Sequence, residues 1–259
     1  MIGIFDSGAG GLSVYREIRK LLPDQGFVYF SDNAHCPYGE KDASYIQERG
    51  RRITETLLEK GAQAIVVACN TATAAAIATL RAAYPVPFIG MEPAVKPAAL
   101  GTCTGVIGVL ATAGTLKGSK YLNTKGRFED DVTIVEHVGQ GFVELVENGI
   151  LDGPEAEAVV RRSLQPLLDA GADRIVLGCT HYPFLAGVIS RIAGPSVQVI
   201  DPAPAVARQL VRVMEGAGIP VREKKALRGS FELLSSGDPA SARRILALID
   251  AADGKKEKQ

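Results

Sequence analysis

One unit occurs twice in this chain: an apolar strand pattern ends in a cysteine, and a helical pattern follows at once. The first copy is AIVVA before Cys69, and the second is RIVLG before Cys179, 110 positions later. Buried strands that alternate with helices form parallel sheets, and such sheets bind ligands at the carboxyl ends of their strands. The two cysteines are therefore expected to face one shared cleft between two similar halves of the molecule.

A second pair of segments keeps nearly the same offset, because EPA at Glu92 is matched 109 positions later by DPA at Asp201. These repeats predict an α/β fold of two pseudo-symmetric lobes, with mainly parallel sheets flanked by helices and the active site in the interlobe cleft. We expect residues 96–203 to form the second lobe, and residues 1–95 together with 204–259 to form the first. The last segment predicts helices at 205–215 and 240–252, a strand at 231–234, and a frayed charged tail at 254–259.

The composition gives no sign of a nucleic-acid-binding or membrane-surface protein. Twenty-nine basic and 29 acidic residues cancel, so no net field attracts a polyanion. No apolar run approaches the roughly 20 residues that a membrane-spanning helix needs, and the N-terminus MIGIFDSG lacks the pattern of a signal peptide. The four cysteines are scattered without CxxC spacing, which argues against a disulfide scaffold or a zinc site and favours the reducing cytoplasm.

A glycine-rich turn, Gly8-Ala9-Gly10, stands between the first predicted strand and a helical pattern. Together with Asp32 at the end of the second strand it resembles half of a dinucleotide-binding fingerprint, but Ser13 stands where the third glycine belongs. Two interpretations remain open. The turn leaves backbone N–H groups free to bind a small anion such as a carboxylate, or it is a tight turn without a ligand.

The four cysteines fall into two classes. Cys36 and Cys103 are expected to be buried thiols that behave as small apolar side chains. Cys69 and Cys179 each stand between a strand end and a helix start, where the helix N-terminus lowers a thiol pKa toward the reactive thiolate. His181 follows Cys179 by two positions, and it is either a proton partner for that thiol or a structural hydrogen-bonding residue.

Two matched thiols favour one kind of chemistry over another. A Cys–His pair alone is typical of nucleophilic acyl transfer, but that interpretation leaves Cys69 and the repeat unexplained. Racemisation uses two acid/base groups on opposite faces of one substrate: one removes a proton from a chiral carbon, and the other returns a proton from the opposite side. It requires no cofactor if the site stabilises the carbanion electrostatically.

Four stretches of the chain carry a resemblance to a known family: DSGAGGLSV (6–14), PYG (37–39), ACNTATA (68–74) and GCTHYP (178–183). Their sequence and order resemble the signature stretches of the bacterial glutamate racemase family. The resemblance implies an isomerase without pyridoxal or metal that interconverts L- and D-glutamate. It also implies a cytoplasmic enzyme that supplies D-glutamate for peptidoglycan synthesis, and hence for cell-wall biogenesis and cell shape.

The resemblance also implies roles for individual residues. Cys69 would act on the α-proton of the D-enantiomer and Cys179 on that of the L-enantiomer. Asp6 would support Cys69, while Glu147, in the local match LVENG, and His181 would support Cys179. The residues that would hold the substrate are Asp6, Ser7, Pro37, Tyr38, Gly39, Asn70, Thr71, Thr112, Thr115, Thr180 and His181.

Several alternatives and partners follow from the same residues. A racemase of the same fold that acts on aspartate or a hydantoin would use the same chemistry, although GCTHYP together with DSGxGG favours glutamate. A paralogue that binds an amino acid without turning it over would gain nothing from two thiols. The expected partners are the small-molecule substrate and a second copy of the chain in a homodimer, with no metal, nucleic acid or membrane.

Overall fold

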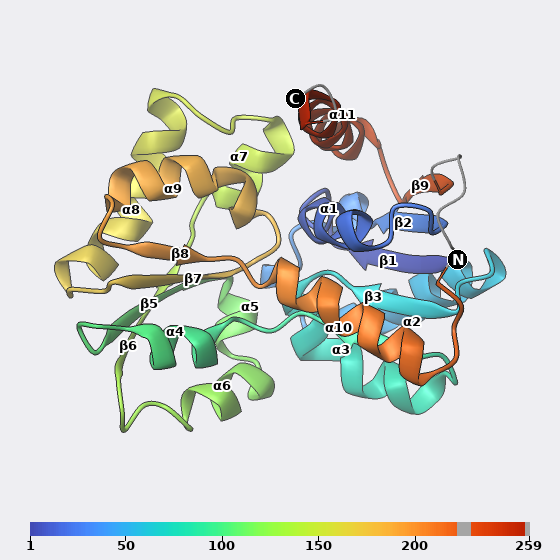
Figure 1. Ribbon diagram of the computed structural model, residues 1–259, viewed down its shortest axis with the longest axis horizontal. Helices are drawn as coiled ribbons and strands as arrows, with labels where there is room; N and C mark the ends of the chain where they lie inside the picture. Colours follow the sequence, from blue (N-terminus) through green and yellow to red (C-terminus); the bar gives the residue numbers. More distant parts are fainter. Residues whose placement is uncertain (222–228, 257–259) are drawn as a thin grey trace.

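The computed structural model describes residues 1–221 and 229–256, and of the last four of these only the backbone. Within this range the chain forms two β-sheets side by side, each with helices on both faces (Figure 1). Every strand pairing described is parallel. This arrangement confirms the predicted α/β class with parallel sheets flanked by helices.

The first sheet has five strands in the order β4-β3-β1-β2-β9. They are β1 (Ile2–Asp6), β2 (Phe27–Ser31), β3 (Ala64–Val67), β4 (Phe88–Gly90) and β9 (Phe231–Ser235). The central strand β1 is buried along its whole length, as is typical of a parallel strand covered on both faces. Successive side chains of β1 point to opposite faces, so Ile4 joins one apolar cluster and Phe5 joins another.

Helices cover both faces of the first sheet. On the side of Ile4 lie α1 (Leu12–Leu21), α10 (Ala203–Gly216) and α11 (Ala240–Lys256). On the side of Phe5 lie α2 (Ala43–Glu59) and α3 (Asn70–Ala83). Two short 3-10 turns, Asn33–His35 and Tyr38–Glu40, lie between β2 and α2.

The second sheet has four strands in the order β6-β5-β7-β8. They are β5 (Val106–Ala111), β6 (Thr133–Val138), β7 (Arg174–Gly178) and β8 (Gln198–Ile200). One face is covered by α7 (Phe142–Asn148), α8 (Pro154–Asp169) and α9 (Ala186–Ala193), and the other by α4 (Val95–Gly101) and α6 (Ser119–Lys125). The short helix α5 (Ala113–Leu116) follows β5, and a 3-10 turn, Tyr182–Leu185, leads into α9.

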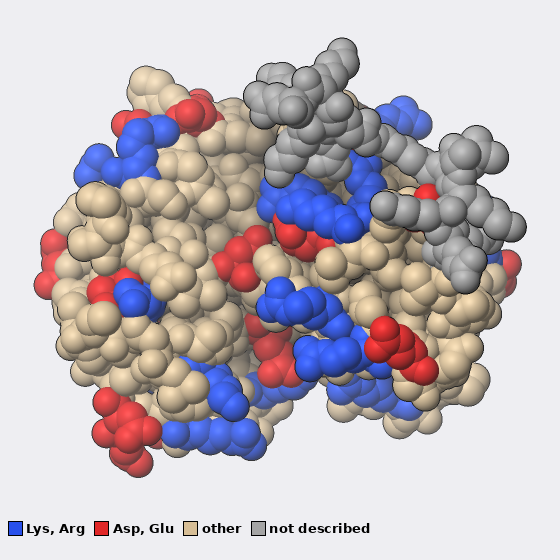
Figure 2. Space-filling view, viewed as in Figure 1, with Lys and Arg blue, Asp and Glu red and all other residues tan. Residues whose placement is uncertain are grey.

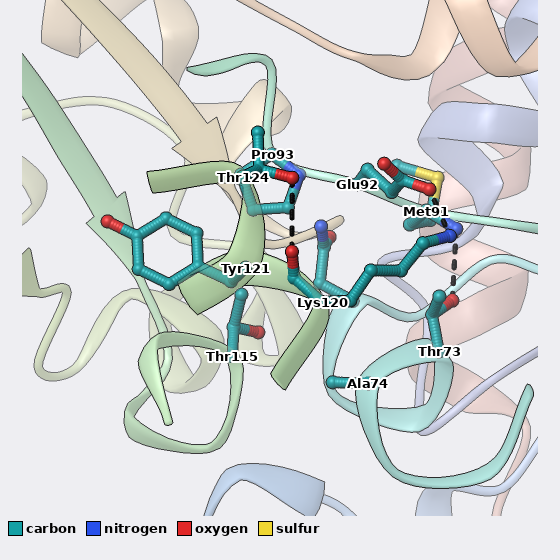
Figure 3. Close-up of a pocket in the computed structure, with 10 residues that line it drawn as sticks. Thr73, Ala74, Met91, Glu92, Pro93, Thr115, Lys120, Tyr121 and Thr124 are labelled. Carbon is teal, nitrogen blue, oxygen red and sulfur yellow. Dashed lines mark hydrogen bonds and ion pairs between the residues drawn. The ribbon is translucent and has the colours of Figure 1, made fainter. Parts of the chain in front are cut away.

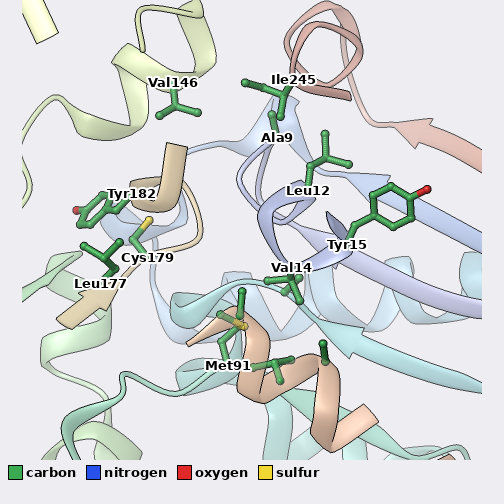
Figure 4. Close-up of a cluster of buried hydrophobic side chains, with 14 of the residues drawn as sticks. Ala9, Leu12, Val14, Tyr15, Met91, Val146, Leu177, Cys179, Tyr182 and Ile245 are labelled. Carbon is green, nitrogen blue, oxygen red and sulfur yellow. The ribbon is translucent and has the colours of Figure 1, made fainter. Parts of the chain in front are cut away.

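One apolar cluster continues from the first half of the molecule into the second. Figure 4 shows Leu12 and Val14 of α1 on one side of it, Leu177 and Tyr182 on the other, and Ile245 of α11. Interiors of this kind are close-packed and resist relative displacement of their parts. The relative placement of the two sheets is therefore set by packing as well as by the chain crossings.

The strands divide between the sheets as the internal repeat led us to expect. Strands from residues 2–90 and 231–235 share one sheet, and strands from residues 106–200 form the other. The exact lobe boundaries stay a prediction.

At the C-terminus, α11 runs to Lys256. The expected frayed tail is therefore wrong for residues 254–256, because the helix continues through them. Residues 257–259 lie outside the described part of the chain.

The surface carries charges of both signs. On the face drawn in Figure 2, basic and acidic side chains lie interspersed near the boundary between the two halves, in keeping with a formal net charge of zero. Among the described residues, no helix is long and apolar enough to cross a membrane.

The docking of α11 can be tested with two substitutions on the same helix. Ile245 is fully buried, whereas Leu248 is 48% exposed. Ile245→Ala should lower the free energy of unfolding by about 2–5 kcal/mol because it leaves a cavity in the shared cluster. Leu248→Ala should change it by no more than about 0.5 kcal/mol. Urea unfolding followed by circular dichroism measures both, and equal losses would contradict this packing.

Candidate active site

The carboxyl ends of β3 and β7 face one small cavity between the two halves of the molecule. Cys69 stands two residues after β3, Cys179 stands directly after β7, and both line the cavity. The cavity has room for about one water molecule. The residues that line it are Ser7, Pro37, Tyr38, Gly39, Cys69, Asn70, Thr71, Thr112, Val143, Cys179, Thr180 and His181.

Most of the residues predicted to hold the substrate are among these lining residues. Asp6 and Thr115 are not, and neither is Glu147, which was predicted to support Cys179; each of the three contacts a lining residue instead. Thr115 hydrogen-bonds to the Thr112 hydroxyl, with 2.9 Å between the two oxygens. Val143 of α7 lines the cavity although no motif drew attention to it, since an apolar residue on a short helix carries no chemical signal in the sequence.

Cys179 has a charged support that reaches back across the interface. Its Sγ lies 3.7 Å from Nδ1 of His181, and Nε2 of that ring lies 2.7 Å from Oε1 of Glu147. The Ser241 hydroxyl of α11 donates to the other carboxylate oxygen of Glu147. Arg244, one turn further along α11, donates from Nη1 to the Glu147 carbonyl at 3.3 Å. Sequence reasoning missed Ser241 and Arg244 because only the tertiary fold brings α11 to α7.

The glycine-rich turn after β1 forms the other side of this contact. Gly8 and Gly11 donate their backbone N–H groups to the Asp6 carboxylate at 3.2 and 2.9 Å, and Ala9 donates to Oε1 of Glu147 at 2.7 Å. The N–H groups therefore do bind carboxylates, although the choice between a ligand site and a turn without a ligand stays open. The carboxylates belong, however, to the protein's own side chains.

Two glycines of this turn allow the second half of the chain to approach closely. A Cβ at Gly8 would lie 2.2 Å from Oε1 of Glu147, and a Cβ at Gly10 would lie 2.4 Å from Nδ1 of His181. Both separations are far below van der Waals contact, and the atoms met are buried or hydrogen-bonded. Glycine is required at both positions because Glu147 and His181 lie so close. The backbone angles do not require it, since neither residue has a positive φ.

Burial and hydrogen bonding shift the pKa values of Glu147 and His181 in opposite directions. Burial favours the neutral form of each, but the His181 contact outweighs it and lowers the pKa of Glu147 to about 2. Burial also opposes a charge on His181, yet hydrogen bonds to Cys179 and Glu147 raise the pKa of its ring well above the ordinary value. The pair is therefore an imidazolium–carboxylate ion pair at neutral pH, with both ring nitrogens able to donate.

Cys69 has a different environment. It caps α3, and its Sγ accepts a hydrogen bond from the Ala72 N–H at 3.4 Å. Burial nevertheless raises the pKa of Cys69 well above the ordinary thiol value, and the nearby Asp6 carboxylate raises it further. The expectation of a lowered pKa at this helix N-terminus is wrong for Cys69, because desolvation exceeds the effect of the helix. In this closed arrangement Cys69 is a protonated thiol.

The side chain of Asp6, the last residue of β1, is fully buried. Burial raises its pKa, against the opposing effects of the His181 charge and the N–H groups of the glycine-rich turn. The Thr180 hydroxyl, from the other half of the chain, donates to its Oδ1 at 3.3 Å. Asp6 thus contacts the glycine-rich turn of the first half and Thr180, the residue that follows Cys179.

Asn70 presents a polar group without a partner. Its side chain is buried, and among the described residues neither its amide nitrogen nor its amide oxygen has a hydrogen-bond partner. A buried unpaired polar group costs about 1–3 kcal/mol. Asn70 lines both the cysteine cavity and a second small cavity, shown in Figure 3, that lies toward Thr73, Glu92 and Lys120. The Asn70 amide is therefore available to a ligand.

The other two cysteines are not the core thiols that we expected. Cys103 is exposed, and Cys36 is half-buried. Cys103 sits in a loop after α4, where Nη2 of Arg174 lies 3.9 Å from its sulfur, whereas Cys36 lies close to Glu147 and His181. Asp32, the residue that mimicked a nucleotide-binding acid, instead accepts two hydrogen bonds from Arg49, at 2.6 and 2.9 Å.

The sequence can now be compared with known proteins. A family model described as Asp/Glu/Hydantoin racemase matches residues 2–210. The chain belongs to this family. Since a racemase is an isomerase, the family places the chain among the isomerases.

Individual relatives in the family agree with the resemblance seen in the motifs. The glutamate racemase of Methylococcus capsulatus is 49% identical over 249 residues, which cover 96% of this chain and 91% of the relative. The structure of the Bacillus anthracis isoform RacE1 superposes with a TM-score of 0.84 at 33% identity, covering 95% of this chain and 91% of that one. The structure of the Escherichia coli glutamate racemase, in complex with L-glutamate and the activator UDP-MurNAc-ala, superposes with a TM-score of 0.83 at 33% identity. The match covers 96% of this chain and 95% of that one. These matches confirm the resemblance to bacterial glutamate racemases.

The ion pair beside Cys179 can be tested by titrating His181. Glu147→Gln removes the carboxylate that stabilises the charged ring, so the His181 pKa should fall and the ring should lose its proton at lower pH than in the wild type. Glu144→Gln, an exposed change on the same helix, should leave the titration in place. NMR of the imidazole resonances follows both, since the chain has only three histidines. An unchanged His181 titration in Glu147→Gln would contradict the ion pair.

Proposed function

We propose that this chain is a glutamate racemase in which Cys69 and Cys179 are the two acid/base groups. The observation that carries the proposal is that the thiols of two repeated units line one cavity from opposite halves of the molecule. The names of the relatives at about half identity support glutamate over aspartate or a hydantoin as the substrate. The presence of both thiols argues against a protein that only binds an amino acid.

The proposed reaction moves one proton at each thiol. In the L-to-D direction the Cys179 thiolate takes the α-proton, the electron pair stays on the α-carbon, and the Cys69 thiol gives its proton to the opposite face. The reverse direction exchanges the two roles, and proton exchange with water restores the starting form. The raised pKa of Cys69 supports this scheme, because a proton donor must hold its proton beforehand. His181 supports the other side by donating Nδ1–H toward the Cys179 sulfur.

The remaining lining residues would hold the substrate and stabilise the carbanion. We assign this role to Ser7, Asn70, Thr71, Thr112 and Thr180, together with Asp6 and the Pro37-Tyr38-Gly39 wall. Hydroxyl, amide and backbone donors aimed at two carboxylates stabilise the negative charge that develops when the α-proton leaves. This chemistry needs no metal or pyridoxal.

A surface groove offers the substrate a route to the cavity. It is lined by Lys41 and Lys117, and it reaches Gly39 and Thr71, which also line the cavity. Glu40 and Asp42 line it as well, so the groove offers charges of both signs to the two carboxylates and the ammonium group of the amino acid. Because the cavity itself holds about one water molecule, we expect the two halves to separate on this side for the substrate to enter.

The setting of the enzyme is part of the same proposal. The D-glutamate product would serve peptidoglycan synthesis. A cytoplasmic, reducing compartment would keep both thiols free of disulfides. A homodimer remains the expected assembly.

The two-base scheme predicts complementary defects in two cysteine variants. Cys69→Ser and Cys179→Ser should each abolish racemisation of glutamate, because a serine hydroxyl is too weak a base without an activating partner. Each should keep the proton removal that its remaining thiol starts. With glutamate analogues that carry a leaving group on the β-carbon, Cys69→Ser should eliminate from the L-analogue and Cys179→Ser from the D-analogue.

The measurement is circular dichroism for racemisation and product analysis for elimination, in buffer that contains a chelator and no pyridoxal. Cys103→Ser, which changes an exposed thiol, is the control and should keep full racemisation. Ordinary racemisation in either active-site variant would overturn the two-base scheme. Full wild-type activity with aspartate and none with glutamate would overturn the substrate assignment.

The unpaired amide of Asn70 predicts that its removal stabilises the fold and weakens substrate binding. Asn70→Leu should raise the free energy of unfolding by about 1–3 kcal/mol, because it removes buried polar atoms without partners, and it should raise KM for glutamate. Thr54→Val is the matched control, since the Thr54 hydroxyl is also buried and unpaired among the described residues but lies in α2, away from the cavity. It should leave KM unchanged. An unchanged KM in Asn70→Leu would contradict a role for this amide in binding.

A further inference from the structure

Cys36 has no part in the proton transfers proposed above, yet its thiol lies beside the groups that support Cys179. Cys36, Glu147 and His181 each offer one possible metal-binding atom, and these atoms all lie within 4.8 Å of one another. The three residues come from distant segments: a loop between two 3-10 turns, helix α7, and the turn after β7. We propose that they form a binding site for a zinc ion that inhibits the enzyme.

The donor set suits zinc in particular. A thiolate sulfur, an imidazole nitrogen and a carboxylate oxygen are its usual ligands, and three protein ligands leave one position for water. Zinc bonds of about 2.0–2.3 Å place tetrahedral ligand atoms roughly 3.3–3.8 Å apart. The observed limit of 4.8 Å therefore requires a contraction of about 1 Å, which the Cys36 loop can supply because it lies outside helices and strands. The His181 and Glu147 atoms, now 2.7 Å apart, must separate by roughly 0.6 Å to admit the ion.

The surroundings hold two of the ligands in place. Glu147 accepts hydrogen bonds from the Ala9 N–H and the Ser241 hydroxyl, and the Nδ1 of His181 faces Cys179. Hydrogen bonds of this kind orient ligands and strengthen metal binding. Gly8 leaves the necessary room, because a Cβ there would lie 3.3 Å from the Cys36 sulfur and would collide with Glu147. The side chain of Glu147 is 19% exposed, which gives an ion access from solvent.

Zinc at this position changes the group that faces Cys179. On binding, two protons leave to solvent, one from the Cys36 thiol and one from Nε2 of the His181 imidazolium. The ring then becomes a neutral zinc ligand, and the ion pair with Glu147 is lost. Racemisation then slows because Cys179 loses its imidazolium partner. The ion is an inhibitor in this scheme and not a cofactor. Only the inhibition depends on the proposed racemase function, since binding can be measured without substrate.

The test uses cobalt(II) as a spectroscopic substitute for zinc on the full-length chain, reduced with a phosphine. The wild type should bind one cobalt ion with a thiolate-to-metal charge-transfer absorption, and zinc should displace it. Cys36→Ser should lose this absorption. Its affinity for zinc should fall by at least about 10- to 100-fold, because removal of a mere outer-shell partner of a metal ligand already costs that much. Cys103→Ser, which changes an exposed thiol, should match the wild type.

Activity assays complete the test. Without metal, Cys36→Ser should racemise glutamate like the wild type, and its racemisation should resist zinc concentrations that inhibit Cys103→Ser. If Cys36→Ser keeps the charge-transfer absorption and the zinc sensitivity, the ion binds the catalytic thiols and the proposed site is wrong. If the wild type shows no such absorption, the three residues form no metal site. Binding by a wild type that lacks racemase activity would uphold the site and overturn the proposed function instead.

Discussion

The placement of the two thiols relative to each other depends on one buried contact, in which the His181–Glu147 ion pair packs against the glycine-rich turn after β1. The pair can lie there only because Gly8 and Gly10 have no Cβ, and the turn fixes Glu147 through the Ala9 N–H. Removal of one partner from a buried ion pair costs about 3–5 kcal/mol, since the other charge is left uncompensated. The contact joins the two halves of the chain at the point where their strands end, and so it determines how Cys179 faces the first lobe.

The internal repeat makes the backbone of the site symmetric, but the side chains make its chemistry asymmetric. Cys69 has a buried carboxylate nearby, Asp6, and its raised pKa keeps the proton on sulfur. Cys179 instead has an imidazolium within hydrogen-bonding distance. A two-base racemase needs one group with a proton and one without in each direction of turnover. Equivalent strand ends supply the opposed positions, and different neighbours give the two thiols different electrostatic surroundings.

The sequence predicted the parts of the structure that depend on local pattern. Apolar runs before Cys69 and Cys179 indicated two buried strands, and the fold has both cysteines at the expected strand ends. The sequence did not predict contacts between segments that are distant along the chain. Nothing local connects Ser241 with Glu147, and nothing marks Cys103 as exposed. The predicted direction of the Cys69 pKa shift was wrong for the same reason. A helix N-terminus can be predicted from sequence, but the degree of desolvation follows from the packed fold.

The contacts across the cavity differ in how easily a substrate can replace them. The Thr71 and Thr112 hydroxyls bridge the two halves at 2.8 Å, and a substrate carboxylate can take up both hydrogen bonds without leaving a charge unpaired. The contact of Glu147 with the first half has no such substitute, since its loss would break the hydrogen bonds from the Ala9 N–H and the Ser241 hydroxyl. Opening of the cavity on the threonine side therefore has the lower free-energy cost, and that side also meets the groove lined by Lys41 and Lys117. The ion pair and the apolar cluster behind it then act as the fixed side about which the halves separate, so the support of Cys179 is kept while the substrate enters.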